Sequence, residues 1–434
     1  MGGEVKSMRN LLALVCLIVF AAGCGRAPVS SLPAGDYKLF EAASTRNSQL
    51  VVVIDSRSQK TDRRLPWGTP SPDGRHFYSL GSDTLQDLDP HTGAVLNSVK
   101  IAGNFQLPPS TMSGIAGGLS QNGRWLVLQA FDSTPNTNSG PTATHMLIVD
   151  TSAPKVAARI DLTGFFEFDA VSNDGQRVYV IEYATTSSIA GSSTYRVRVY
   201  EVGPGHLGDY TVVDKGDPNE PMQGLRLSGV FSPDGQWLYS VYARENKGAF
   251  VHALNLTYPF AYCLELPGNG WSQDPGTFQW SLALSGDGRH LYAANGAMGL
   301  VTQIDNLDGM NPSIVRTGHI GVAGPSAGLL AQDVTAKEFG PNGAVLSHDG
   351  TSLVIAGTTG VVWVDTATLH ARNHQLTAWT VWSLAASPDG NLLYVLNDAG
   401  KIAALSMDGM VTATFDPAEG YPMGLIRVEA AAAP

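Results

Sequence analysis

Short apolar runs alternate with polar turns along most of the chain, and no long stretch has apolar residues at helical spacing. One turn recurs seven times in the form Ser-x-Asp/Asn-Gly, and a β-prone run such as residues 237–239 follows each copy. The copies begin at Ser71, Ser120, Ser172, Ser232, Ser285, Ser347 and Ser387, so their serines are 49, 52, 60, 53, 62 and 40 residues apart by subtraction. Repetition at this period predicts stacked or radially arranged copies of one structural unit.

The last copy shows the content of one unit. Strands are expected at residues 382–386, 392–396, 401–406 and 410–415, separated by turns rich in Asp, Asn and Gly. Four antiparallel strands in a repeat of this length form the blade of a β-propeller. The chain is therefore predicted to be all-β, with seven full units.

Two terminal segments decide the number of blades. Residues 37–43, 49–54 and 61–65 have the pattern of three strands, and residues 420–428 resemble the inner strand at 221–227. Three strands from the start of the chain and one from its end complete a further blade, and this pairing removes an exposed sheet edge. We therefore expect eight blades. In the alternative there are seven blades, and the terminal pieces are appended strands.

Composition supports an all-β protein and excludes some classes of function. A chain of 434 residues with 43% hydrophobic and 15% charged residues can bury a large core, and its 48 glycines are too many for a helical protein. The net charge of −11 comes without any cluster of Lys and Arg. This argues against nucleic-acid binding and against adsorption to anionic lipids.

The first residues have the pattern of a secretory signal. Lys6 and Arg9 precede an uninterrupted apolar stretch at residues 11–20, which is too short for an ordinary spanning helix. Such a segment predicts an exported protein.

The end of this segment, Ala-Ala-Gly-Cys at 21–24, resembles the bacterial lipoprotein box, although Ala stands where Leu is common. The resemblance implies that Cys24 carries the lipid; in the alternative, a plain signal peptide is cut near Ala22. Cys263 is then the one cysteine of the propeller, so we expect no internal disulfide and an inert buried thiol. The expected organisation follows the chain as a signal peptide at 1–23, a tether at 24–35, a single propeller domain at 36–429 and a tail at 430–434. We expect a membrane-anchored lipoprotein of the bacterial envelope, on its periplasmic or cell-surface side.

The repeats resemble the YVTN-type family of bacterial β-propellers and related periplasmic propellers with S-P-D-G turns. Besides the turns, the third strands match at residues 52–55, 147–150, 302–305 and 362–365, each of which ends in Asp. The resemblance covers roughly residues 36–429 and implies the fold. It implies little about function, because such propellers have many unrelated roles.

The order of strands also predicts which face carries function. In four-stranded antiparallel blades the S-x-D-G turns all lie on one face, here called the S-x-D-G face. The second turns and the links between blades lie on the other, here called the link face. The long irregular segments fall on the link face, at residues 132–144, 185–194, part of 205–224, 267–279 and 319–341. Long loops on a rigid scaffold are where propellers usually place function, whereas the alternative is that these are tolerated insertions.

The sequence has no signature of covalent haem or of a phosphate loop. There is no C-x-x-C-H and no phosphate loop, and the spacing of His370 and His374 makes a metal pair only on a helix. We expect no cofactor and no metal. The candidate ligand-binding residues on the link face are Trp271, Gln273, Asp274, His319 and Asp333, whereas Trp280 and Trp382 are expected to pack between blades.

Two functions of different classes remain. The first, which the sequence favours, is a non-enzymatic lipoprotein whose propeller binds or scaffolds a protein or glycan partner in the envelope. The second is a hydrolase resembling the propeller lactonases, whose carboxylates and histidine come from separate blades. Acidic side chains and a histidine meeting at one mouth of the channel would favour the second.

Overall fold

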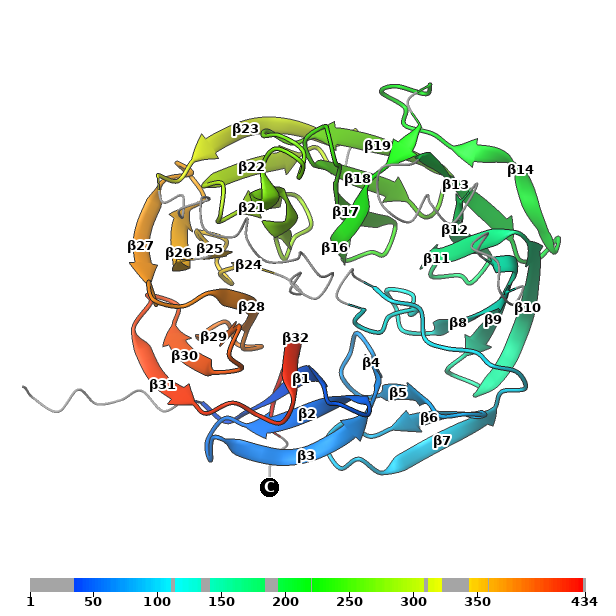
Figure 1. Ribbon diagram of the computed structural model, residues 1–434, viewed down its shortest axis with the longest axis horizontal. Helices are drawn as coiled ribbons and strands as arrows, with labels where there is room; N and C mark the ends of the chain where they lie inside the picture. The colour runs from blue at the N-terminus through cyan, green and yellow to red at the C-terminus, as the bar shows by residue number, and fades with distance from the viewer. Residues whose placement is uncertain are drawn as a thin grey trace, which may run out of the picture. The chain divides into compact units, whose positions relative to one another are not determined.

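The computed structural model describes residues 35–110, 114–133, 141–183, 194–219, 221–307, 311–321, 343–357 and 359–431. These residues form eight antiparallel sheets arranged as the blades of a ring (Figure 1). The prediction of an eight-bladed β-propeller is confirmed, and the alternative of seven blades is wrong. No helix in the described part of the chain has the length and hydrophobicity needed to cross a membrane.

We number blades 1 to 7 along the chain and call the remaining one the closing blade. From the centre outward, blade 1 contains β4 (Gly68–Pro70), β5 (Phe77–Leu80), β6 (Thr84–Leu88) and β7 (Val95–Lys100), and blade 2 contains β8 (Trp125–Ser133), β9 (Pro141–Asp150) and β10 (Lys155–Thr163). Blade 3 contains β11 (Phe165–Val171), β12 (Arg177–Tyr183), β13 (Thr194–Glu201) and β14 (His206–Val212), with β15 (Met222–Gln223) paired to β13. Blade 4 contains β16 (Leu225–Phe231), β17 (Trp237–Ala243), β18 (Phe250–Asn255) and β19 (Phe260–Glu265).

Blades 5 to 7 follow after one short 3-10 helix, η2 (Pro275–Gln279). They contain β20 (Trp280–Leu284), β21 (Leu291–Asn295), β22 (Leu300–Asp305) and β23 (Ser313–His319); β24 (Ala344–Leu346), β25 (Ser352–Gly357), β26 (Gly360–Asp365) and β27 (Ala371–Gln375); and β28 (Val381–Ala386), β29 (Leu392–Asn397), β30 (Ile402–Ser406) and β31 (Val411–Phe415). The four strands expected for the last unit are thus confirmed within two residues at each end.

The closing blade joins the two ends of the chain. Its order is β32 (Tyr421–Ala430), β1 (Tyr37–Ser44), β2 (Gln49–Asp55) and β3 (Lys60–Pro66), as the sequence predicts. The inner strand β32 is antiparallel to β1, with Tyr37 opposite Ala430 and Ser44 opposite Tyr421. Both edges that an open ring would expose are therefore paired.

Blade 2 departs from the expected seven full units. Its sheet has three strands, and the inner position is occupied by residues that make isolated bridges, Gln106 with Gln129 and Leu119 with Leu126. Pro108 and Pro109 lack the backbone N–H that a ladder requires, and Gly118 has a φ of +102°. These residues prevent a regular inner strand.

Each sheet packs between two neighbours, so the middle strands are buried on both sides. All seven residues of β17 and all five of β21 are buried, whereas the outer strand β7 is largely exposed. One core cluster joins the closing blade to blade 7 through residues such as Leu39, Leu425 and Tyr394. Burial between blades, and not within one sheet, therefore holds the ring together.

The seven S-x-D-G turns have the same geometry. In each, the Ser hydroxyl donates to the Asp or Asn side chain at 2.5–2.7 Å and accepts from the backbone N–H five residues after the Ser. The turn glycines all have φ between 69° and 72°. The backbone of residues other than glycine is strained in this region. The turn is therefore encoded locally by three residue types.

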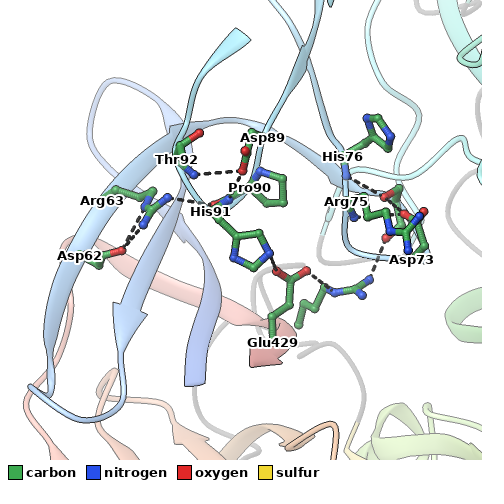
Figure 2. A network of polar contacts seen from close by, with 12 residues as sticks. Asp62, Arg63, Asp73, Arg75, His76, Asp89, Pro90, His91, Thr92 and Glu429 are labelled. Carbon is green, nitrogen blue, oxygen red and sulfur yellow. Dashed lines mark hydrogen bonds and ion pairs between the residues drawn. The ribbon is translucent and has the colours of Figure 1, made fainter. Parts of the chain in front are cut away.

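A polar network at the end of β32 fastens the closing blade to blade 1 (Figure 2). The Arg427 guanidinium donates to the Ser71 backbone oxygen at 2.7 Å and lies 2.5 Å from the Glu429 carboxylate. His91 approaches the same carboxylate at 3.6 Å, and burial raises the pKa of Glu429 above its usual range. We call Ser71, His91, Arg427 and Glu429 the closing latch. It lies on the S-x-D-G face.

Candidate functional site

The inner strands enclose a cavity of about 730 Å³ at the centre of the ring, here called the channel cavity. Its described lining comes from blades 1 to 6 and the closing blade. Most of the lining residues are apolar, such as Ile115, Leu284, Val345 and Ile426. This volume falls in the range of sites that bind small molecules.

Blades 3 and 4 place one ion pair in the cavity wall. Asp169 and Arg226 are the charged side chains in its described lining, and an Arg226 nitrogen lies 2.7 Å from the Asp169 carboxylate. The Asp169 side chain is 1% exposed and that of Arg226 is 15% exposed. Burial raises the pKa of Asp169, and the Arg226 guanidinium offsets part of that rise. Arg226 is thus the charged group that a ligand in the channel can reach.

A second carboxylate stands beside this pair. Glu167 precedes Asp169 by two residues on β11, and its carboxylate accepts a hydrogen bond from the Tyr183 hydroxyl at 2.9 Å. Burial raises the pKa of Glu167 above its usual range. The wall between blades 3 and 4 therefore combines a carboxyl of raised pKa with an ion pair.

Several buried polar atoms in this wall and directly behind it have no hydrogen-bond partner among the described residues. They are the Asp169 Oδ2, the hydroxyls of Ser228 and Ser240, and those of Tyr195 and Tyr242. Ser228 and Ser240 also line the cavity. Because buried polar groups usually bind protein or ordered water, this wall is a polar region suited to polar ligand groups or water.

A row of aromatic rings lies behind the wall, towards the link face. Neighbouring ring centroids are 4.9–6.4 Å apart. The row runs through Phe131, Phe165, Tyr183, Tyr195, Tyr242 and Phe250. Packed rings of this kind stiffen blades 2 to 4 against one another.

The residues proposed from the link at 267–279 do lie on the link face, but they do not line the channel cavity. Trp271 is only partly exposed because its ring stacks on Phe278 at 5.1 Å. Asp274 caps η2 by accepting from the Gly276 N–H at 2.9 Å, which is a structural role. Gln273 is exposed. Of the three, Gln273 is the one whose side chain is presented to solvent.

The remaining proposed residues are dispersed. His319 is exposed at the end of β23, far along the chain from the ion pair of blades 3 and 4. Asp333 and the lipid-attachment candidate Cys24 lie outside the described residues, so both stay predictions. The two expected inter-blade tryptophans differ: Trp280 is 2% exposed, whereas Trp382 is partly buried and meets Tyr421 of the closing blade.

Histidines do not meet carboxylates at the described part of the cavity wall. His252 is on β18, two strands outward from β16, which carries Arg226, and burial, with a smaller effect of Arg226, lowers the pKa of His252 to about 4. His374 on β27 lies against the Thr359 backbone oxygen at 2.5 Å. No cluster of three His, Cys, Asp or Glu side chains suited to a metal occurs in the described part of the chain. At the described part of the cavity wall, the carboxylates expected for a hydrolase are therefore present, and no histidine accompanies them.

Sequence reasoning missed Glu167, Asp169 and Arg226 because it searched the loops. A signal was available, since inner strands are otherwise apolar and these three charges interrupt the runs FFEFDAV and LRLSGVF. Arg427 and Glu429 interrupt β32 in the same way. Charged residues within predicted inner strands would have located both the cavity wall and the closing latch.

Comparison with known proteins extends no further than the fold. No family model matches the chain, and no curated protein matches it. The solved structure of apo AztD from Citrobacter koseri is similar over 91% of this chain and 97% of that one, with a TM-score of 0.51 and 11% identity. Dihydro-heme d1 dehydrogenase NirN in complex with DHE matches 92% of this chain and 75% of that one, with a TM-score of 0.48 and 15% identity. The Pseudomonas aeruginosa periplasmic gluconolactonase PpgL matches 90% and 98%, with a TM-score of 0.43 and 18% identity.

Proposed function

We propose that this chain is an exported lipoprotein, related to YVTN-type propellers, whose channel cavity binds a peptide or glycan fragment of the bacterial envelope. The observation that supports this most is the channel cavity of about 730 Å³ with one reachable charge, Arg226, in a mostly apolar lining. A few polar groups in an apolar cavity orient a small ligand. A flat surface for a whole protein would need no such cavity.

The position of the tether supports a particular orientation. Gly35 accepts a hydrogen bond from Ser56, and the Tyr37 hydroxyl donates to Asp389 of the S-x-D-G turn of blade 7 at 2.6 Å. The chain therefore enters the propeller at the S-x-D-G face. A tether at 24–35 spans at most about 40 Å when fully extended. With a lipid on Cys24, the S-x-D-G face would lie towards the membrane and the link face away from it.

The anchor has a simple test. We expect Cys24→Ser to be released from the membrane fraction or to accumulate with its signal uncut. Unchanged processing and unchanged membrane retention would contradict the anchor and leave a plain signal peptide as the explanation.

The cavity is tested by filling it. Peptidoglycan fragments, short peptides and sugar acids are the probes, and the measurement is the rise in melting temperature that each gives with the purified protein. Val345→Trp on β24 places a large ring in the cavity lining, and Val411→Trp, on an outer strand with Val411 43% exposed, is the matched control. We expect one class of probe to stabilise the wild type and the control but not Val345→Trp.

Two results would contradict a binding role for the cavity. One is that no probe stabilises the wild type, and the other is that Val345→Trp responds as the wild type does. Hydrolysis of a lactone probe that is lost in Glu167→Gln would instead favour the hydrolase alternative.

A further inference from the structure

Three side chains with soft or borderline donor atoms converge at the junction of blades 3 and 4. Met222 belongs to β15, His252 to β18 and Cys263 to β19, and His252 and Cys263 are direct cross-strand partners. The Cys263 sulfur lies 3.5 Å from the His252 Nδ1 and 3.9 Å from the Met222 sulfur. We expected an inert thiol that is buried. The expected burial is wrong, because Cys263 is partly exposed.

Hydrogen bonding explains this arrangement poorly. The His252 side chain is buried, with 2% exposure, and its Nε2 has no partner among the described residues. Within that part of the chain, the hydrogen-bonding contact of the ring is the Cys263 sulfur, which is a weak partner. A fully buried imidazole placed against a thiol, which itself lies beside a thioether, requires another reason.

We propose that Met222, His252 and Cys263 form a binding site for one Cu(I) ion. Nitrogen and sulfur ligands lie about 2.0–2.3 Å from a d¹⁰ ion such as Zn²⁺. Three such ligands in a plane around one ion are therefore roughly 3.5–4.0 Å apart. The two separations of 3.5 and 3.9 Å involving Cys263 match that geometry before any ion is bound.

The donor set selects the ion. Thiolate and thioether ligands favour Cu(I), and imidazole also suits copper. Structural zinc is almost always four-coordinate and bound by Cys, His and carboxylates, whereas this set combines one imidazole, one thiol and one thioether. Met222 and Cys263 are partly exposed, so an ion can reach the site from the rim of the propeller, separately from the channel cavity.

The test measures Cu(I) affinity of the full-length protein, without oxygen, by competition with the chelator bicinchoninate. The background carries Cys16→Ser and Cys24→Ser, so that no thiol before the propeller contributes, whether or not the signal is cut. We expect one Cu(I) per chain, with sulfur and nitrogen as its nearest neighbours by X-ray absorption.

Variants assign the ligands. We expect Met222→Leu, which keeps the side-chain volume, to weaken Cu(I) binding at least tenfold, and Cys263→Ser at least a hundredfold. Met298→Leu, at a partly buried methionine of the blade 5 hairpin, is the matched control and should bind as the wild type does. Circular dichroism melting shows that each variant is folded.

Three results would overturn the proposal. The wild type fails to take Cu(I) from the chelator, Zn(II) binds more tightly than Cu(I), or Met222→Leu retains wild-type affinity. The last variant conserves packing, so its result is decisive even if Cys263→Ser does not fold.

Discussion

The two faces of the propeller are built on opposite principles. On the S-x-D-G face, seven turns repeat one set of hydrogen bonds, and their glycines have φ values within 3° of one another. On the link face, the connections differ in length and composition, and the link at 267–279 rests on the neighbouring hairpin through bonds from Trp271 and Ser272 to the backbone at Arg244 and Glu245. Local residue chemistry determines the first face, and contacts between blades determine the second.

This difference separates stability from ligand chemistry. Successive S-x-D-G turns also touch around the ring, since the glycine of one turn lies against Pro72, Pro233 or His348 of another. The same face carries the closing latch. We therefore expect substitutions on the S-x-D-G face to change the free energy of unfolding. Substitutions of exposed link-face residues should leave that free energy unchanged, whether or not they change binding.

The largest effect is expected from deleting residues 420–434. The deletion removes β32 and the closing latch, exposes the edge of β1 and opens the channel. We expect aggregation and loss of cooperative unfolding, because an open edge is a template for pairing. Static light scattering and thermal melting measure this. A truncated protein as soluble and as stable as the full chain would contradict closure by β32.

Arg427→Met should cost about 3 kcal/mol, because it leaves the buried Glu429 without its guanidinium partner, and His91 lies farther away, at 3.6 Å. Arg427→Met combined with Glu429→Gln should recover part of that loss, since no unpaired charge remains. Urea unfolding of both variants measures the difference. Equal losses in the single and double variants would show that the latch acts through packing alone.

Asp234→Ala should cost about 1 kcal/mol, because its Oδ1 accepts from the Ser232 hydroxyl at 2.5 Å and from the Gln236 N–H at 3.0 Å. Asp234→Asn is the matched control, since Asn122 makes the same two contacts in the turn of blade 2. Melting temperature is the measurement, and the Asn variant should lie near the wild type. Loss of ligand binding in Asp234→Ala at full stability would mean that the S-x-D-G face binds.

Acid should weaken the S-x-D-G face by a smaller amount. Hydrogen bonds from the Ser347 hydroxyl and from Thr351 lower the pKa of Asp349 to about 2. Its contribution to stability is therefore fully present above the unfolded pKa near 4 and is lost as pH falls towards 2. We expect Asp349→Asn to lose less melting temperature between pH 5 and pH 2.5 than the wild type does. Identical acid sensitivity in both proteins would count against this contribution.

The smallest effect on stability is expected at Gln273. Its exposed side chain on the link face makes Gln273→Ala neutral within about 0.5 kcal/mol, as for most surface substitutions. Trp271→Ala should cost about 1 kcal/mol more, because its stacking on Phe278 is lost. Melting temperatures and probe binding of the two variants should be measured together. A clear loss of stability in Gln273→Ala would contradict the expectation that exposed link-face residues do not contribute to the free energy of unfolding.

Local information in the sequence was enough for the architecture. Strand propensity and the S-x-D-G turn act within a few residues, so the repeat predicted four-stranded blades, and the strand count at the two termini predicted eight. The same reasoning overestimated blade 2, because Pro108 and Pro109 override a repeat that continues on both sides of them.

Only the tertiary structure decided which distant side chains meet. Asp169 and Arg226 are 57 residues apart, and Met222 and Cys263 are 41 apart, each pair on different strands of neighbouring blades. Whether such groups touch depends on the rotation and spacing between two packed sheets. Those quantities arise from burial over the whole interface between blades and from the closure of the ring, and no single segment of the sequence contains them.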